Sequence, residues 1–209
     1  MDLKIKLCGI RRLEDIDSLN EFKPDYAGFV FAPSKRQVSI EQAKRISEQL
    51  LPCIVRVGVF VNQPIEEMAA FSDTIDIYQL HGDEDEAYIN RLRQIVPQKE
   101  IWKAVRVKDK NDILRANSLT ADKLLFDAFS KTAYGGTGKT FDRELLAKEK
   151  INKPFFAAGG ITADNLEETA KALTPFGIDL SGGIETNGVK DREKIRQIME
   201  IAEKIRKEH

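Results

Sequence analysis

The stretch PFFAAGGITADNLEETAKALTPFGIDLSGGIE, residues 154–185, contains one pattern twice. A short apolar run ends in a Gly-Gly-Ile motif at AAGGIT (157–162), and the same order returns at LSGGIE (180–185). Between the two motifs, Thr162 and Asp164 are each suited to the N-cap of a helix. A strand, a helix and a second strand in this order predict a βαβ unit with parallel strands.

The same alternation extends over the whole chain. Eight short apolar runs are bounded by Gly, Asp, Pro or Ser and are too brief for helices, so we expect strands at 3–8, 26–31, 54–60, 75–80, 100–105, 123–128, 154–159 and 177–181. Segments with helical spacing separate them, including 40–51, 84–96 and 191–206, and the weakest helix is expected at 141–147. Ser39 with Gln42 predicts a capping box, and Pro64 suits a first helical turn.

Eight such units predict a (β/α)₈ TIM barrel of the α/β class, with its active site at the carboxyl ends of the strands. A doubly wound open sheet is the competing architecture, because a strand count alone does not enforce closure. Composition never shifts along the chain, so we expect a single domain over residues 1–209. Since such barrels typically take about 250 residues, 209 residues indicate a near-minimal barrel with short loops.

Charge and composition exclude several classes of protein. With 33 basic and 34 acidic side chains, the chain has no excess of positive charge for a nucleic acid. No apolar run approaches the roughly 20 residues that span a membrane, and the N-terminal segment has no secretory signal. Two cysteines, Cys8 and Cys53, make a disulfide framework implausible, which favours a cytoplasmic protein.

Polar groups at the predicted strand ends are the candidates for chemistry. Cys8 closes the first strand; a thiol with a pKa of about 8.5 needs a nearby cation for catalysis, and Arg36 is one candidate. The alternative is a small core hydrophobe, which is our interpretation of Cys53. Asp127 ends the sixth strand inside an apolar run, where it either faces a polar site or caps its own loop. Asp179 in the eighth strand poses the same question.

The glycine motifs and the remaining polar residues indicate a phosphate ligand rather than a metal. Paired glycines let backbone N–H groups approach an anion, and two such pairs follow the last two strands, where barrels often bind phosphate. The alternative is that the glycines only make tight turns. His81 is a possible ligand group or a structural histidine, and no cluster has metal-ligand spacing. YGGTGKT (134–140) is not a P-loop because Ala133 replaces the first glycine, so we expect a flexible loop beside the substrate.

The motifs taken together resemble the phosphoribosylanthranilate isomerase family over nearly the whole chain. They are KLCGI (6–10), GFVFAPSKRQVS (28–39), VGVFVN (57–62), YQLHGDE (78–84), LLFDA (124–128), GGTGKTFD (135–142), AAGGI (157–161) and DLSGGIETNGVKD (179–191). The resemblance implies a step of tryptophan biosynthesis, the Amadori rearrangement of N-(5-phosphoribosyl)anthranilate to 1-(2-carboxyphenylamino)-1-deoxyribulose 5-phosphate. It implies no metal and no organic cofactor.

The resemblance also implies residue roles. Cys8 matches the general base and Asp127 the general acid, while Arg36 would help to hold the anthranilate carboxylate or polarise the site. His81 and Asp179 are the other expected substrate-binding residues. The phosphate would be held by Gly159, Gly160, Ser181, Gly182 and Gly183. This chain has Ser-Gly-Gly at 181–183 where the family commonly reads Ser-Ser-Gly, and Arg143 where members often have Trp.

Other phosphosugar barrels are the nearest alternatives. An indole-glycerol phosphate synthase would be expected to show catalytic Lys and Glu at strand ends, and a metal-dependent ribulose-phosphate epimerase a His/Asp cluster; neither constellation is present. A non-catalytic phosphosugar-binding barrel would have no reason to keep Cys8 together with Asp127. The only partner expected is therefore a small phosphosugar-anthranilate substrate, with no nucleic acid and no membrane.

Overall fold

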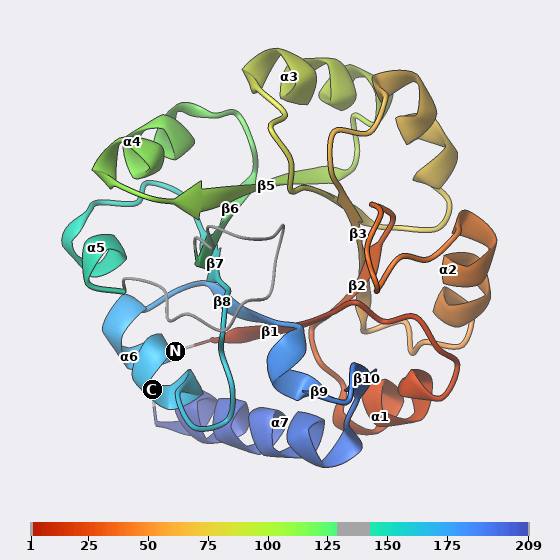
Figure 1. Cartoon of the computed structure of the whole chain (residues 1–209), viewed down its shortest axis with the longest axis vertical. Coiled ribbons are helices and arrows are strands. Elements are labelled where there is room, and N and C mark those ends of the chain that lie inside the picture. The colour runs from red at the N-terminus through yellow and green to blue at the C-terminus, as the bar shows by residue number, and fades with distance from the viewer. Residues whose placement is uncertain (1, 129–142, 209) are drawn as a thin grey trace.

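The computed structural model of the chain describes residues 2–128 and 143–208. Eight parallel strands form a closed barrel, which confirms the expected fold over the open sheet (Figure 1). They are β1 (Lys4–Cys8), β2 (Tyr26–Val30), β3 (Val55–Phe60), β4 (Ile77–Leu80), β5 (Glu100–Val107), β6 (Lys123–Ala128), β7 (Phe155–Ala157) and β8 (Gly177–Leu180). Closure is made by β1 and β8, which pair from Lys4 opposite Gly177 to Leu7 opposite Leu180.

A helical segment follows each strand and lies outside the barrel (Figure 1). These are α1 (Asp15–Phe22), α2 (Ile40–Ser47), the 3₁₀ helix η1 (Ile65–Phe71), α3 (Glu86–Ile95), α4 (Lys110–Ser118), α5 (Arg143–Lys148), α6 (Leu166–Leu173) and α7 (Arg192–Lys207). A short 3₁₀ turn η2 (Gly182–Ile184) and a hairpin of β9 (Glu185–Thr186) and β10 (Val189–Lys190) separate β8 from α7 and were not expected. No helix in residues 2–128 or 143–208 combines the length and apolar character that crossing a membrane requires.

The helix starts agree only in part with the sequence pattern. Ser39 caps α2, its Oγ accepting from the Gln42 N–H at 3.1 Å, but the Gln42 side chain donates to the Arg11 carbonyl instead of closing a capping box. At α6 the expected caps, Thr162 and Asp164, are wrong, because Asn165 is the residue that flanks the helix. Its Oδ1 accepts from the Thr162 N–H and its Nδ2 donates to the Gly160 carbonyl, both at 3.0 Å. The Asn165 amide has an acceptor and a donor on separate atoms and so binds both backbone groups at once, whereas an ionised carboxylate such as that of Asp164 has no donor.

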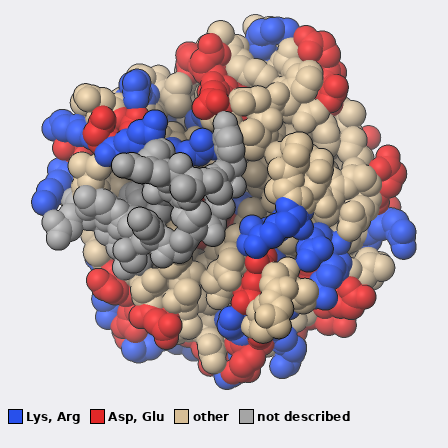
Figure 2. All heavy atoms as spheres, viewed as in Figure 1, with Lys and Arg blue, Asp and Glu red and all other residues tan. Residues whose placement is uncertain are grey.

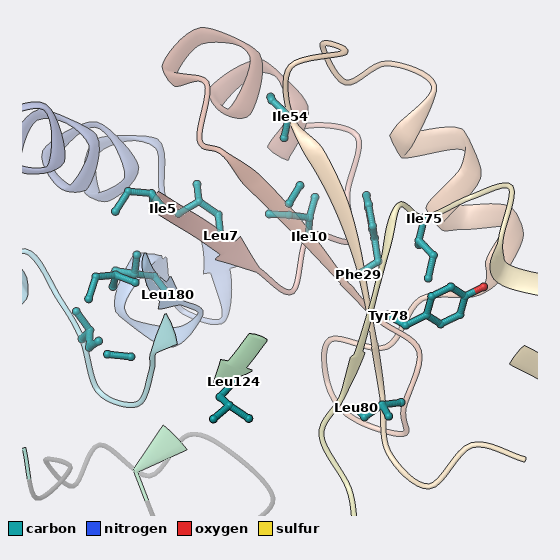
Figure 3. Close-up of a cluster of buried hydrophobic side chains, with 14 of the residues drawn as sticks. Ile5, Leu7, Ile10, Phe29, Ile54, Ile75, Tyr78, Leu80, Leu124 and Leu180 are labelled. Atoms are coloured by element: carbon teal, nitrogen blue, oxygen red, sulfur yellow. The ribbon is translucent and has the colours of Figure 1, made fainter. Parts of the chain in front are cut away.

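Strand alternation divides the apolar residues between two layers. Side chains that point outward, such as Ile5, Leu7 and Phe29, are fully buried between the barrel and its helices (Figure 3). The next residue along each strand points into the barrel, because successive side chains alternate between the two faces. The helices therefore cover one apolar surface, and the barrel interior is left to a second set of residues.

The interior toward the amino ends of the strands is filled by aromatic rings. Trp102, the only tryptophan of the chain, stacks on Phe156 with ring centroids 4.7 Å apart, and Tyr26 meets Trp102 edge-on at 5.1 Å. The indole N–H donates to Glu100 at 2.7 Å. Val57, Ile77 and Leu125 complete this apolar layer. Because the lower half is packed, the open end of the barrel lies at the carboxyl ends of the strands.

Candidate active site

A cavity of about 530 Å³ lies at the carboxyl ends of the strands. Its lining includes every residue that the sequence singled out for the site, namely Cys8, Arg36, His81, Asp127, Gly159, Gly160, Asp179, Ser181, Gly182 and Gly183. Lys and Arg side chains gather near the centre of the face shown in Figure 2. The Gly-rich segment 134–140 lies outside the described residues.

Cys8 lies at the end of β1, directly above a buried lysine. Alternation along KIKLC places Lys6 and Cys8 on the same interior face of the strand. Lys6 is fully buried and its Nζ pairs with Asp179 Oδ1 at 2.8 Å. Burial raises the pKa of the Cys8 thiol, and the positive charge of Lys6 opposes that rise. Cys8 is therefore a thiol in the resting protein at neutral pH, beside a cation that the sequence analysis missed although it stands two positions earlier.

Asp127 and His81 lie next to each other in the lining of the cavity. The Asp127 Oδ2 lies 3.5 Å from His81 Nε2, and Gln79 Nε2 lies 3.2 Å from His81 Nδ1. Gln79 is fully buried in the barrel and was not expected at the site. The result is a chain of polar groups from the barrel interior to the Asp127 carboxylate.

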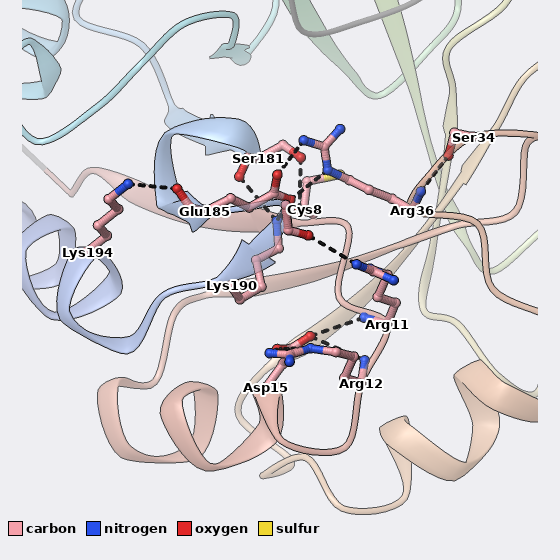
Figure 4. A network of polar contacts seen from close by, with 11 residues as sticks. Cys8, Arg11, Arg12, Asp15, Ser34, Arg36, Ser181, Glu185, Lys190 and Lys194 are labelled. Atoms are coloured by element: carbon pink, nitrogen blue, oxygen red, sulfur yellow. Dashed lines mark hydrogen bonds and ion pairs between the residues drawn. The ribbon is translucent and has the colours of Figure 1, made fainter.

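Arg36 is held by a carboxylate rather than left free beside Cys8. Its Nε and Nη2 donate to Glu185 Oε1 and Oε2, both at 2.7 Å (Figure 4). Burial disfavours the Glu185 carboxylate, yet hydrogen bonds from Arg36 and Lys190 lower its pKa to about 2. The stem of Arg36 covers Gly9, where a Cβ would stand 2.4 Å from the Arg36 Cδ. The guanidinium thus has a fixed position at the cavity.

Lys190 of β10 links the end of β1 to the residue that follows β8. Its Nζ donates to the carbonyls of Cys8 and Ser181 at 2.6 and 3.2 Å, and to Glu185 Oε1 at 2.9 Å (Figure 4). The Ser181 hydroxyl also donates to the Cys8 carbonyl, at 3.1 Å. Glu185 and Lys190 were missed because nothing near them in the sequence predicts a contact with residues 8 and 36.

The two Gly-Gly-Ile loops touch each other at the cavity. Gly159 and Gly160 have φ angles of +90° and +63°, a region that L side chains rarely adopt. A Cβ on Gly183 would stand 1.9 Å from the Ile161 carbonyl oxygen, so only glycine allows the two loops to approach this closely. Gly182 differs, since a Cβ there would have Arg36 Nη2 at 3.7 Å as its nearest neighbour, an ordinary contact.

Comparison with known proteins places this geometry in a family. A family model described as N-(5'phosphoribosyl)anthranilate (PRA) isomerase matches residues 5–201. The N-(5'-phosphoribosyl)anthranilate isomerase of Thermoanaerobacter sp. strain X514 is 43% identical over 206 residues, covering 98% of this chain and 100% of the relative.

Solved structures agree with the sequence comparison. The crystal structure of phosphoribosyl anthranilate isomerase from Thermotoga maritima is similar with a TM-score of 0.85 and 34% identity, covering 97% of this chain and 99% of that one. A phosphoribosyl anthranilate isomerase in complex with reduced 1-(o-carboxyphenylamino)-1-deoxyribulose 5-phosphate gives a TM-score of 0.81 at 32% identity, with coverages of 97% and 99%. From its fold, its cavity and these relatives, the chain belongs to the N-(5'-phosphoribosyl)anthranilate isomerase family.

Proposed function

We propose that the protein converts N-(5-phosphoribosyl)anthranilate to 1-(2-carboxyphenylamino)-1-deoxyribulose 5-phosphate, a step of tryptophan biosynthesis in the cytoplasm. The observation that carries the proposal is that Cys8 and Asp127, from β1 and β6, line the same cavity as both Gly-Gly-Ile loops. A relative of the same fold holds a reduced form of this product. Both cysteines are free thiols, in keeping with a reducing compartment.

Two proton transfers are needed, and the site has one group for each. Asp127 protonates the ring oxygen of the ribose, so that the furanose opens to a Schiff base. Cys8 first loses its proton to solvent; the resulting thiolate then removes the proton from C2, and the enolamine relaxes to the ketone. Because the iminium accepts the electron pair, the rearrangement needs no further electron sink. Each positioned proton transfer contributes roughly 10²–10⁴ in rate.

The remaining residues hold the two ends of the substrate. The phosphate binds at Gly159, Gly160, Ser181, Gly182 and Gly183, where the four glycines have no side chain between the backbone and the cavity. Arg36 uses two of its five N–H groups on Glu185 and directs the rest toward the anthranilate carboxylate. His81 and Asp179 contact the ribose between these ends.

The test follows the fluorescence of the anthranilate group during turnover. The wild-type protein is expected to change the signal, and Cys8→Ser and Asp127→Asn are each expected to lose about 10²-fold or more in kcat. Cys53→Ser is the matched control, because Cys53 is exposed and outside the cavity. An unchanged signal with wild type, or full activity in both variants, contradicts the proposed function and favours a barrel that only binds a phosphosugar.

A further inference from the structure

The ion pair of Lys6 and Asp179 has no part in the proton transfers described above. It lies inside the barrel, where Lys6 is fully buried and Asp179 is 8% exposed. Burying two charges is costly, and apolar side chains of similar size often fill such a space at no loss of stability. Other residues inside the barrel, among them Val57, Trp102 and Leu125, are apolar. The stability of the fold therefore does not explain why a charged pair occupies this position inside the barrel.

The lysine lies against the thiol of Cys8. A Cβ placed on Gly28 of β2 would stand 2.9 Å from Cys8 Sγ and 3.2 Å from Lys6 Nζ, so both atoms occupy the space that a side chain there would need. Gly28 is the residue opposite Cys8 in the β1–β2 pairing. A glycine at this position thus lets the ammonium and the sulfur lie together beneath the cavity.

We propose that Lys6 is a positioning residue for the base: its ammonium stabilises the Cys8 thiolate, and Asp179 keeps the ammonium charged and aimed at the sulfur. This rests on the proposed role of Cys8 as the base. The proton from C2 passes to Sγ and restores the thiol, while Lys6 retains its own proton throughout. An opposite charge within a few ångströms is the usual means by which a protein favours a thiolate.

The other charged groups that face Cys8 are less able to serve. Lys190 lowers the pKa of Cys8 less than Lys6 does, and the negative charge of the Cys8 thiolate raises the pKa of Arg36. Both of these cations are paired with Glu185. Asp179 opposes ionisation of the thiol, and His81 and Asp127 line the other side of the cavity. Among these groups the charge of Lys6 does most to lower the pKa of Cys8, against the rise that burial causes.

The experiment titrates the thiol itself, independently of turnover. In a Cys53→Ser background Cys8 is the sole cysteine, and the ultraviolet absorbance of its thiolate is followed against pH, with Cys8→Ser subtracted as the blank. Lys6→Met is expected to raise the pKa of Cys8 by about one to three units. The limb of the kcat/KM profile that reports the base moves by the same amount, so that activity at neutral pH falls about tenfold for each unit.

Two further variants make the outcome decisive. Lys6→Met/Asp179→Asn removes both charges and should fold if the single variant does not, with a smaller upward shift because Asp179 no longer opposes ionisation. Lys103→Met/Glu84→Gln removes another buried pair, joined at 3.0 Å outside the cavity, and should leave the pKa of Cys8 unchanged. An unmoved titration of Cys8 in the Lys6 variants overturns the proposal even if the enzyme is active. A wild-type protein that leaves the substrate unchanged refutes the proposed function but not the titration.

Discussion

Gly182 and Gly183 are neighbours after β8, but a side chain would meet different surroundings at each. A Cβ at Gly183 collides with the Ile161 carbonyl, whereas one at Gly182 has room beside Arg36. The resemblance noted in the sequence implies a serine at the position of Gly182, where a Cβ meets only an ordinary contact.

We therefore expect Gly183→Ala to separate the two loops, lower stability by about 2 kcal/mol or more and raise KM for the phosphosugar substrate. Gly182→Ser serves as the matched variant and should keep wild-type stability within about 0.5 kcal/mol. Thermal unfolding and KM of the two variants check this. Equal effects from both substitutions would show that loop contact at Gly183 has no special importance.

The ionisation of Glu185 makes the stability of the fold depend on pH. Its pKa is about 2 in the folded protein, below the value of about 4.3 expected when unfolded, so its ionised form stabilises the fold. That contribution is complete above about pH 4.3 and is lost as the pH falls toward 2. Glu185→Gln should thus cost more stability at pH 7 than at pH 3. Denaturant unfolding at the two pH values measures it, and a cost independent of pH would contradict the ionic role.

At this scale the sequence predicted which groups gather at the cavity but not what holds them. Strand ends meet at one end of a barrel, so Cys8, Asp127 and the glycine loops converge once the strands are placed. Glu185 of β9 binds Arg36, and Lys190 of β10 binds the carbonyl of Cys8. No local sequence pattern predicted this hairpin. Lys6 is the exception, because alternation along β1 already puts it on the face of Cys8.

Among the elements, α7 is capped by the side chain of Asp191. Asp191 Oδ1 accepts from the backbone N–H groups of Glu193 and Lys194 at 2.9 and 3.2 Å, and Oδ2 accepts from Thr186 Oγ1 of β9 at 2.6 Å. The cap therefore joins the longest helix to the hairpin that holds Arg36.

Asp191→Ala is expected to lower stability by about 1–2 kcal/mol, because two helix N–H groups lose their acceptor. Ser39→Ala, which removes a single cap bond at α2, should cost less. Chemical denaturation of both variants tests this ranking. If Asp191→Ala is the milder change, the cap does not fix α7.

Element positions were largely predictable because strands and helices have distinct periods of two and 3.6 residues. Boundaries were less predictable: Asn165 precedes α6 and its side chain binds the Gly160 and Thr162 backbone of the preceding loop, a choice of partners that a list of favourable cap residues does not reveal. The segment after Pro64 formed a 3₁₀ helix, η1, which the search for α-helical spacing did not distinguish.

For the whole molecule, closure is the property that local patterns cannot predict. Pairing of β1 with β8 joins residues more than 170 positions apart, and the sequence supplied only the count of eight units that makes closure natural. The packed aromatic layer lies inside the barrel that this closure completes.

Phe156→Ala tests this layer. Phe156 is fully buried and touches the rings of Tyr26, Trp102 and Phe176, so we expect a loss of about 3–5 kcal/mol. Leu114→Ala removes an equally apolar side chain that is 50% exposed and should change stability by about 0.5 kcal/mol or less. Circular dichroism melts compare the two. Similar melting temperatures would show that the interior layer does not limit stability.

The single tryptophan in that layer, Trp102, is an intrinsic fluorescent probe of the barrel. Trp102 emits in the near ultraviolet, where an anthranilate group absorbs, and it is fixed inside the same barrel whose open end holds the cavity. Resonance energy transfer from the indole to a bound anthranilate would therefore report occupancy at equilibrium, with no turnover required. An inactive Cys8 or Asp127 variant would thus still display its substrate affinity as quenched indole emission, which separates binding from chemistry in one unlabelled protein.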